Sequence, residues 1–271
     1  MEKPAELPDS KQFIGHILAI EINDFLPARG QPGQSRSRVI PNILHLLDHI
    51  DKHRAEGNFY ITGELTRAFP EIVSLVSSRG HEIGVCVDSY NGMRLGDVAS
   101  FRTELEQITG KPAVGVMLKS PDAEGRSRLK QLAEKGFKYA LTDFKLSSRG
   151  KNTMPINVNF DRNIAIEVFP PSVFTVSGID LKFGQPGKIR LYPFWFLRKC
   201  VRNYTHGDNP AVINFPLWEF DPHLPRRILS PLQSLKSYGN LSLAEFKLTR
   251  LLMEFDFATI PKILNLEERK T

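Results

Sequence analysis

The feature that most constrains the fold is a repeated order of apolar strand, helix and glycine in the first 145 residues. Strand-like apolar runs alternate with segments of helical periodicity, and a glycine follows each of three helices. Four strand and helix units of this kind require right-handed crossovers and indicate a parallel α/β sheet. The expected strands are 15–22, 58–64, a short run within 79–92, 113–118 and 137–142, and the expected helices are 40–53, 69–79, 97–109 and 126–135.

Length and composition fit an ordinary globular protein. A chain of 271 residues can bury roughly three quarters of its unfolded surface, and 41% hydrophobic with 24% charged residues is a normal balance. The net charge of +6 could suit a nucleic-acid binder, but the basic residues are scattered among acids without a long basic run. We therefore expect no nucleic-acid partner, whereas acidic or nucleotide-linked sugars remain compatible with the charge.

Cysteine usage and the N-terminal residues bear on the compartment. Cys86 and Cys200 form neither a disulfide framework nor a CxxC metal site, which fits a reducing environment. The first 13 residues are polar and broken by proline, so they predict an arm without a signal-peptide core. No apolar run approaches the ~20 residues needed to cross a bilayer. We expect a cytoplasmic protein without a membrane span.

Polar residues stand where the predicted parallel strands end. The first strand runs through Glu21 to Asn23 and Asp24, and the strand within 79–92 carries Cys86 and then enters a polar loop. Chemistry gathers at such strand ends in parallel α/β proteins. A binding or catalytic site is therefore predicted there.

Several stretches resemble one family. RGHEIGVCVDSY, residues 79–90, resembles the second motif of the polysaccharide deacetylases, the NodB-homology carbohydrate esterases, where a phrase such as GHEIASHGYSH supplies two histidines to a divalent metal. WEFDP, residues 218–222, is the most specific match, to a subgroup found in exopolysaccharide loci. The resemblance runs from about residue 14 to residue 264.

The resemblance implies a distorted (β/α)7-type barrel, an α/β fold. It also implies a single domain over 1–271, with an arm at 1–13, a turn-rich segment at 145–190 and a C-terminal helical extension at 225–271. Within these regions we expect further strands at 164–169 and 211–215 and a helix at 243–255.

The catalytic groups of the family are largely replaced. Glu21 stands at the position of the general base, and Asn23 or Asp24 near that of the metal carboxylate. Cys86 and Tyr90 take the places of the two metal histidines. The orienting arginine becomes Met117, with Lys119 nearby, and no histidine stands just before WEFDP. A lone cysteine and one aspartate leave a zinc ion two protein ligands short, so we expect no metal cofactor and no metal-dependent deacetylation.

The candidate catalytic residues are Glu21, Asp24 and Lys119, and the candidate ligand-binding residues are Tyr90, Cys86, Asn23, Asp88, Trp218 and Glu219. For several of these residues an ordinary structural role is an alternative explanation. Glu21 and Asp24 are as well explained as ordinary strand-end acids, and a cysteine on a buried strand is more often structural than reactive. Tyr90 could hydrogen-bond a polar group or stack on a sugar.

Three hypotheses follow. The leading one is a protein of an O-antigen or capsule pathway that lacks the metal site and binds a glycan or nucleotide-sugar at the barrel mouth. The second is a metal-independent hydrolase of sugar amides or esters. The third is a non-enzymatic partner or regulatory subunit that docks through the aromatic residues 194–196, although such a trio is more often core.

A histidine stripe adds one further possibility. His45, His49 and His53 recur at helical spacing, as a metal site could require. Ile43, Leu44, Leu47 and Ile50 are expected to form the buried face, and the stripe lies roughly opposite. Solvated helix surface is the favoured interpretation.

Overall fold

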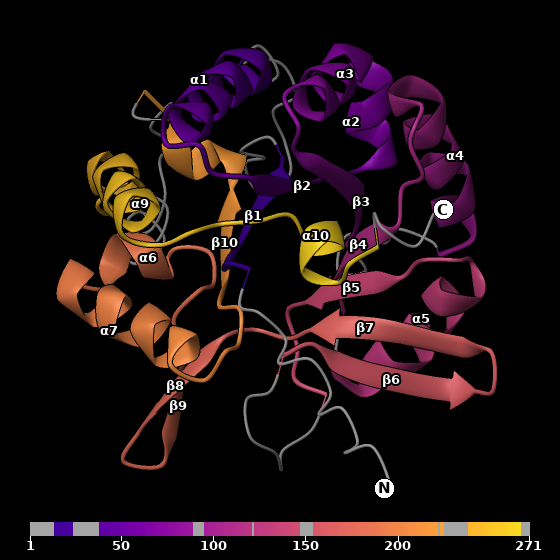
Figure 1. The fold of residues 1–271 in the computed structure, drawn as a ribbon. Helices are drawn as coiled ribbons and strands as arrows, with labels where there is room; N and C mark the ends of the chain where they lie inside the picture. The colour runs from indigo at the N-terminus through magenta and orange to yellow at the C-terminus, as the bar shows by residue number, and fades with distance from the viewer. Residues whose placement is uncertain are drawn as a thin grey trace, which may run out of the picture.

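The computed structural model describes residues 14–23, 38–88, 95–120, 122–146, 154–221, 223–224 and 238–266. Its centre is an eight-stranded sheet that curls into a half-barrel, with the strand order β10-β1-β2-β3-β4-β5-β7-β6 (Figure 1). Seven strands run parallel, and β6 pairs antiparallel to β7. The strands are β1 Ile17–Ile22, β2 Gly57–Ile61, β3 Glu82–Asp88, β4 Gly115–Lys119, β5 Tyr139–Thr142, β6 Ile156–Asp161, β7 Ile164–Phe169 and β10 Val212–Pro216.

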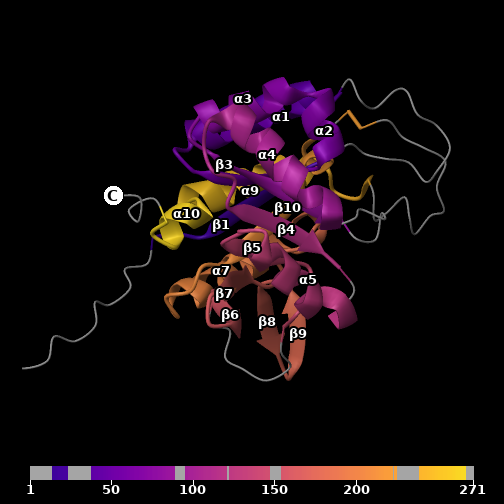
Figure 2. The same ribbon diagram turned by 90° about the vertical axis from the view of Figure 1, so that its right-hand side faces the viewer.

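Helices enclose the curled sheet. One group follows the outside of the sheet, and another gathers at the left of Figure 1, next to β10 (Figures 1 and 2). The first group is α1 Val39–Lys52, α2 Gly63–Ala68, α3 Pro70–Ser78, α4 Val98–Thr109 and α5 Asp122–Glu134. The second is α6 Lys188–Leu191, α7 Phe194–Thr205 and α9 Ser242–Glu254. The short elements are η3 Leu95–Asp97, η4 Leu217–Phe220 and α10 Ile260–Ile263.

Helix α1 shows how the apolar periodicity places a helix on the sheet. Its buried side chains are Val39, Ile43, Leu46, Leu47 and Ile50, a stripe at the helical repeat. The prediction was wrong for Leu44, which is 37% exposed, because the buried stripe is centred one residue further along and includes Leu46.

The histidine stripe of α1 is only partly exposed to solvent, because two of its residues contact α9. His49 Nε2 lies 3.0 Å from Thr249 Oγ1, and His45 Nε2 lies 3.4 Å from Glu245 Oε1. Only 14% of the His49 side chain is exposed. The interpretation as solvated surface was therefore wrong for His49, because α9 packs over it.

Two glycines make room for two tyrosines among the central strands. A Cβ at Gly115 would lie 2.1 Å from Tyr139 Oη, and a Cβ at Gly84 would lie 3.1 Å from Tyr60 Cε1 and 2.6 Å from the Gly115 carbonyl oxygen. Both tyrosines are fully buried. Because every residue of β1, β2 and β5 is buried as well, these strands read as near-continuous apolar runs.

The segment 145–190 contains more regular structure than its turn-rich sequence indicates. The strand predicted at 164–169 is confirmed as β7, whereas β6 and a separate hairpin of β8 Val173–Val176 and β9 Ile179–Lys182 were not predicted. Helix α7, which carries the aromatic residues 194–196, was also missed. None of the helices in the described residues is long and apolar enough to cross a membrane.

Candidate functional site

A cavity lies at the carboxyl ends of the strands, where the sequence analysis expects a site. Its volume is about 300 Å³, and it is lined from β3, β4, β5 and β10 together with the segment before α6. Polar side chains in its wall are Asp88, Lys119, Thr142, Asp143, Gln185 and Asn214. A mixed wall of this size can hold a small polar ligand or a terminal sugar.

A cation and two carboxylates meet at the ends of three strands. Lys119 Nζ, on β4, lies 2.5 Å from Glu21 Oε1 on β1 and 3.9 Å from Asp88 Oδ2 on β3. The Glu21 side chain is 8% exposed and that of Lys119 is 21% exposed. Parallel strands deliver their last side chains to one edge, which is why residues 98 positions apart in the sequence form this pair.

Burial and neighbouring charges determine the protonation states of Lys119 and Cys86. Burial lowers the pKa of Lys119, but the attraction of the Glu21 and Asp88 carboxylates outweighs it, so the pKa lies above its ordinary value. The pKa of Cys86 is well above its ordinary value because the thiol is buried and lies near the Glu21 carboxylate. At neutral pH Lys119 is therefore an ammonium and Cys86 a neutral thiol.

Two further residues of the cavity were missed from the sequence. Asp143 follows β5 and accepts a hydrogen bond from the Ser120 N–H at 3.2 Å, while burial raises its pKa above the ordinary value. Asn214 lies on β10 and is 9% exposed. Its Oδ1 atom is buried and accepts no hydrogen bond from the described residues. The position of Asp143 directly after a predicted strand was a usable signal; Asn214 gave none.

The structure brings together four of the residues singled out from the sequence, Glu21, Cys86, Asp88 and Lys119. Asn23 follows β1, and its buried Oδ1 likewise has no hydrogen-bond donor among the described residues. Asp24 and Tyr90 lie outside the described residues.

Comparison with solved structures shows a common architecture. A protein described as a polysaccharide deacetylase from Mycobacterium smegmatis superposes with a TM-score of 0.59 at 16% identity, over 99% of this chain and 95% of that one. One so described from Pseudomonas aeruginosa PAO1 gives 0.57 at 12% identity, over 94% and 90%. The fold is that of the polysaccharide deacetylases. The Puue allantoinase shares it, with a TM-score of 0.59 at 11% identity over 97% and 92% of the two chains.

Sequence comparison is less informative than the fold. Residues 145–265 match a family described as a domain of unknown function, DUF3473, and no curated protein matches the sequence. The matched part of the chain begins after β5 and includes strands β6 to β10 and helices α6, α7, α9 and α10. It therefore contributes Gln185 and Asn214 to the cavity, whereas Glu21, Asp88 and Lys119 precede it.

In this fold, acidic residues of the WEFDP segment form a structural clamp, that is, a set of buried contacts that hold neighbouring elements together. Glu219 and Arg190 are each 1% exposed, and Arg190 Nε lies 3.2 Å from Glu219 Oε2. Asp221 is fully buried and forms a bidentate pair with Arg38, and it also accepts hydrogen bonds from Asn42 and from the His223 N–H. These contacts join the end of β10 to α1 and α6.

The clamp bears on two residues proposed for ligand binding. Glu219 lies outside the cavity wall, and its carboxylate is held by Arg190. Trp218 lies beside the same arginine, whose Cζ is 5.4 Å from the ring centroid. The structure thus places both residues in packing contacts around Arg190 rather than with Glu21 and Lys119.

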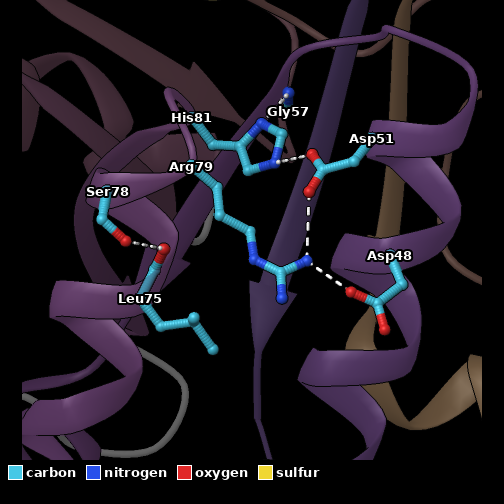
Figure 3. Close-up of polar contacts among 7 residues, drawn as sticks. All are labelled: Asp48, Asp51, Gly57, Leu75, Ser78, Arg79 and His81. Carbon is cyan, nitrogen blue, oxygen red and sulfur yellow. Dashed lines mark hydrogen bonds and ion pairs between the residues drawn. The ribbon is translucent and has the colours of Figure 1, made fainter.

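The sequence GHEI, residues 80–83, is a second structural motif and lies at the amino end of β3. His81 Nδ1 accepts a hydrogen bond from the Gly57 N–H at 3.3 Å, and Nε2 lies 3.1 Å from Asp51 Oδ1 on α1 (Figure 3). Arg79 reaches the same helix at Asp48 and Asp51. The motif ties β3 to β2 and α1 at the end opposite the cavity, which explains its presence without a metal role.

The aromatic residues 194–196 divide between surface and core. Trp195 is 68% exposed, whereas Phe194 and Phe196 are partly buried against the core. The expectation that this trio is core was wrong for Trp195, because its helix position faces outward beside Arg198 and Lys199.

The described residues do not fit a divalent metal at the strand ends. No group of three His, Cys, Asp or Glu side chains among them could hold one. The ammonium of Lys119 already neutralises Glu21, and the protonated thiol of Cys86 is a poor zinc ligand because thiolate is the binding form. The donor set suits hydrogen bonding to a polar ligand instead.

Proposed function

We propose that this chain is a polysaccharide-deacetylase-like protein of a bacterial surface-polysaccharide pathway, such as O-antigen or capsule synthesis, and that it binds a glycan or nucleotide-sugar without metal-dependent deacetylation. The observation that carries the proposal is the Lys119 ammonium held by Glu21 at the mouth of a deacetylase fold. A fixed cation supplies positive charge where the family resemblance implies a metal. It cannot, however, activate a bound water by coordination.

The cavity is suited to a sugar. Its polar groups are hydrogen-bonding side chains, and its apolar wall includes Met117, Leu141 and Val212. A sugar ring presents hydroxyl groups at its edge and C–H groups on its faces, which such a mixed wall can match. Binding without turnover would leave the protein as a carrier or sensor of a pathway intermediate.

Calorimetry and metal analysis test the proposal. A panel of N-acetylated, amino, neutral and UDP-linked sugars is titrated into the full chain, with and without a chelator. We expect one class to bind in both conditions, no stoichiometric zinc, and no acetate release. Lys119→Met should weaken binding about tenfold through loss of a charge-assisted hydrogen bond.

The matched control is Lys130→Met, at a half-exposed lysine on α5 whose nearest ion-pair partner, Glu134, is 3.9 Å away. This variant should bind as the unmodified protein does. Stoichiometric zinc with acetate release, or absence of binding across the whole panel, would overturn the proposal.

A second function is favoured by one contact. The 2.5 Å approach of Glu21 and Lys119 places a carboxylate and an ammonium where they could transfer protons to a sugar amide or ester without metal. Asp24 belongs to the same hypothesis and lies outside the described residues. Hydrolysis that survives chelation and is abolished by Glu21→Gln would establish this function in place of simple binding.

A further inference from the structure

A second concave surface lies between helix α7 and the hairpin of β8 and β9 (Figure 1). Its volume is about 410 Å³, and it shares no lining residue with the cavity at the strand ends. We call it the α7 groove. The residues that define it are Phe174 on β8 and, from α7 and its C-terminal cap, Trp195, Arg198, Lys199, Arg202 and His206.

The helical period of α7 places most of these side chains on its outer face. The inner face consists of the buried residues Leu197, Cys200, Val201 and Tyr204. Trp195, Lys199, Arg202 and His206 follow at spacings of four, three and four residues, so they share the other face. All four are exposed, and Trp195 is 68% exposed. The helix therefore presents a flat apolar ring beside a row of basic side chains.

Contacts with the hairpin hold the aromatic wall of the groove. The ring of Phe196 lies 5.9 Å from that of Trp195 and 5.8 Å from that of Phe174, measured between centroids. Lys199 Nζ lies 5.8 Å from the centroid of the Phe174 ring. The three rings thus form one continuous cluster, with an ammonium beside it. A wall that is already packed loses less conformational entropy when a ligand binds.

The groove carries positive charge that no carboxylate among the described residues matches. Arg198 Nε lies 2.5 Å from Glu254 Oε2, so the charge of this arginine is compensated. Lys199 and Arg202 have no ion-pair partner in the part of the chain that the structure describes, and none of the residues that line the groove is acidic. Two cations are therefore available to an anionic ligand.

The groove is open rather than enclosed. Each of its defining residues is at least partly exposed. A site for a single small molecule buries most of the ligand surface, whereas an open groove contacts only one side of its ligand. The shape therefore favours an extended chain that passes over the helix.

We propose that the α7 groove binds an acidic glycan chain, whose sugar rings carry carboxylates as uronic acids do. The C–H face of one ring lies on Trp195, and Lys199 and Arg202 donate charge-assisted hydrogen bonds to the carboxylates. The preference for a glycan over an acidic peptide rests on the proposed function. The groove is then a second place at which this protein holds a saccharide.

Calorimetric titration of the full chain compares three probes of equal length. They are an α-1,4-linked tetramer of galacturonic acid, the same tetramer with its carboxyl groups methyl-esterified, and an end-capped tetraglutamate. The ester keeps the sugar faces without the charge, and the peptide keeps the charge without the sugar faces. We expect the acidic tetramer to bind at least about tenfold more tightly than either.

Two variants locate the binding in the groove. Trp195→Ala removes the apolar platform and Arg202→Gln removes one cation, and each should weaken binding of the acidic tetramer about tenfold. Both side chains are exposed, so the melting temperatures should stay unchanged. The matched controls are Phe246→Ala, at an exposed aromatic residue of α9, and Arg162→Gln, at an exposed arginine in the turn after β6. Both controls should bind as the unmodified protein does.

Tryptophan fluorescence distinguishes stacking from attraction of charge alone. The chain contains two tryptophans, Trp195 and Trp218. Saturating acidic tetramer should protect the emission of the unmodified protein from quenching by acrylamide. The protection should be absent in Trp195→Ala, where Trp218 alone remains. Quenching that the tetramer leaves unchanged in the unmodified protein would contradict the contact with Trp195.

The other outcomes separate this inference from the proposed function. Equal affinity for the methyl ester, or for tetraglutamate, would overturn the acidic glycan, and so would full affinity in both groove variants. In these cases the proposed function stands if a sugar of its own panel loses affinity in Lys119→Met. Absence of binding across that panel, with the acidic tetramer still bound at the groove, would overturn the proposed function alone.

Discussion

At the scale of single residues, Lys119 does most to decide what the strand ends can do. It is a partly buried ammonium that donates a hydrogen bond to the Glu21 carboxylate, and it lies near a thiol that stays protonated. Buried ion pairs of this kind lose stability sharply when one partner is removed, because the remaining charge is left without compensation.

A double-mutant cycle tests the coupling of Glu21 and Lys119. Lys119→Met should lower the free energy of unfolding by about 3 kcal/mol, because it leaves the Glu21 carboxylate buried and unpaired. Glu21→Gln combined with Lys119→Met should cost less than the sum of the single changes by at least about 1 kcal/mol. Urea denaturation followed by circular dichroism measures both, and strict additivity would contradict the pairing.

At the scale of elements, the central strands depend on close contacts between glycine and tyrosine. Gly84 on β3 and Gly115 on β4 lie against Tyr60 and Tyr139, which come from β2 and β5. Each tyrosine ring lies over the glycine with which it pairs on the adjacent strand, in the space that a larger side chain at that position would occupy. The close packing of these four strands therefore requires that Gly84 and Gly115 carry no Cβ atom.

Gly115→Ala should destabilise the chain by about 1–3 kcal/mol, because its Cβ would meet the Tyr139 hydroxyl at 2.1 Å and force the strands to shift. Gly96→Ala is the control, since a Cβ there has no atom within 4 Å. Thermal unfolding of the two variants gives the comparison. Equal melting temperatures would show that β4 and β5 can separate freely.

The elements also show what the sequence could and could not predict. Strong apolar periods located β1, β7, α1 and α9 to within two residues at each end, because burial determines both the pattern and the element. The strand expected at 58–64 instead ends at Ile61, where Thr62 accepts a hydrogen bond from the Leu65 N–H and caps α2. Edge strand β6 was missed although its apolar and polar residues alternate, because it lies in a segment rich in turn-forming residues.

The candidate site was predictable in the same uneven way. The common location of Glu21, Cys86, Asp88 and Lys119 could be predicted, because strand ends can be recognised and share one edge of a sheet. That of Asn214 could not, because its role depends on which strand β10 adjoins. Glu219 could not be distinguished from a ligand-binding acid, since its partner Arg190 lies 29 residues away in the sequence.

At the scale of the whole molecule, acid stability depends on a histidine buried where both halves of the chain meet. His16 is 1% exposed; Nδ1 accepts a hydrogen bond from the Ala211 N–H at 3.0 Å, and Nε2 lies 3.0 Å from Thr205 Oγ1. Burial lowers the pKa of His16 to about 4 from 6.5. The unfolded chain therefore binds a proton at a higher pH than the folded one.

The sign of the effect follows from this order. As the pH falls from 6.5 towards 4, the unfolded state is protonated first, and the free energy of unfolding should fall by about 3 kcal/mol through His16 alone. His16→Asn keeps an acceptor for Ala211 without the titration. Urea denaturation across this pH range should show a shallower loss for the variant, and parallel curves would contradict the assignment.

The open ends of the half-barrel determine how copies of this molecule can associate. On β10, the N–H of Val212 donates to Ser172 Oγ and that of Asn214 donates to the Gly184 carbonyl, so this rim is already occupied by the chain itself. At the other rim, β6 carries Asn157, Asn159 and Asp161 and a register shift near its end. Neither rim is suited to receiving a strand from a neighbour. A dimer of this molecule would therefore not form by pairing the edge strands of this sheet.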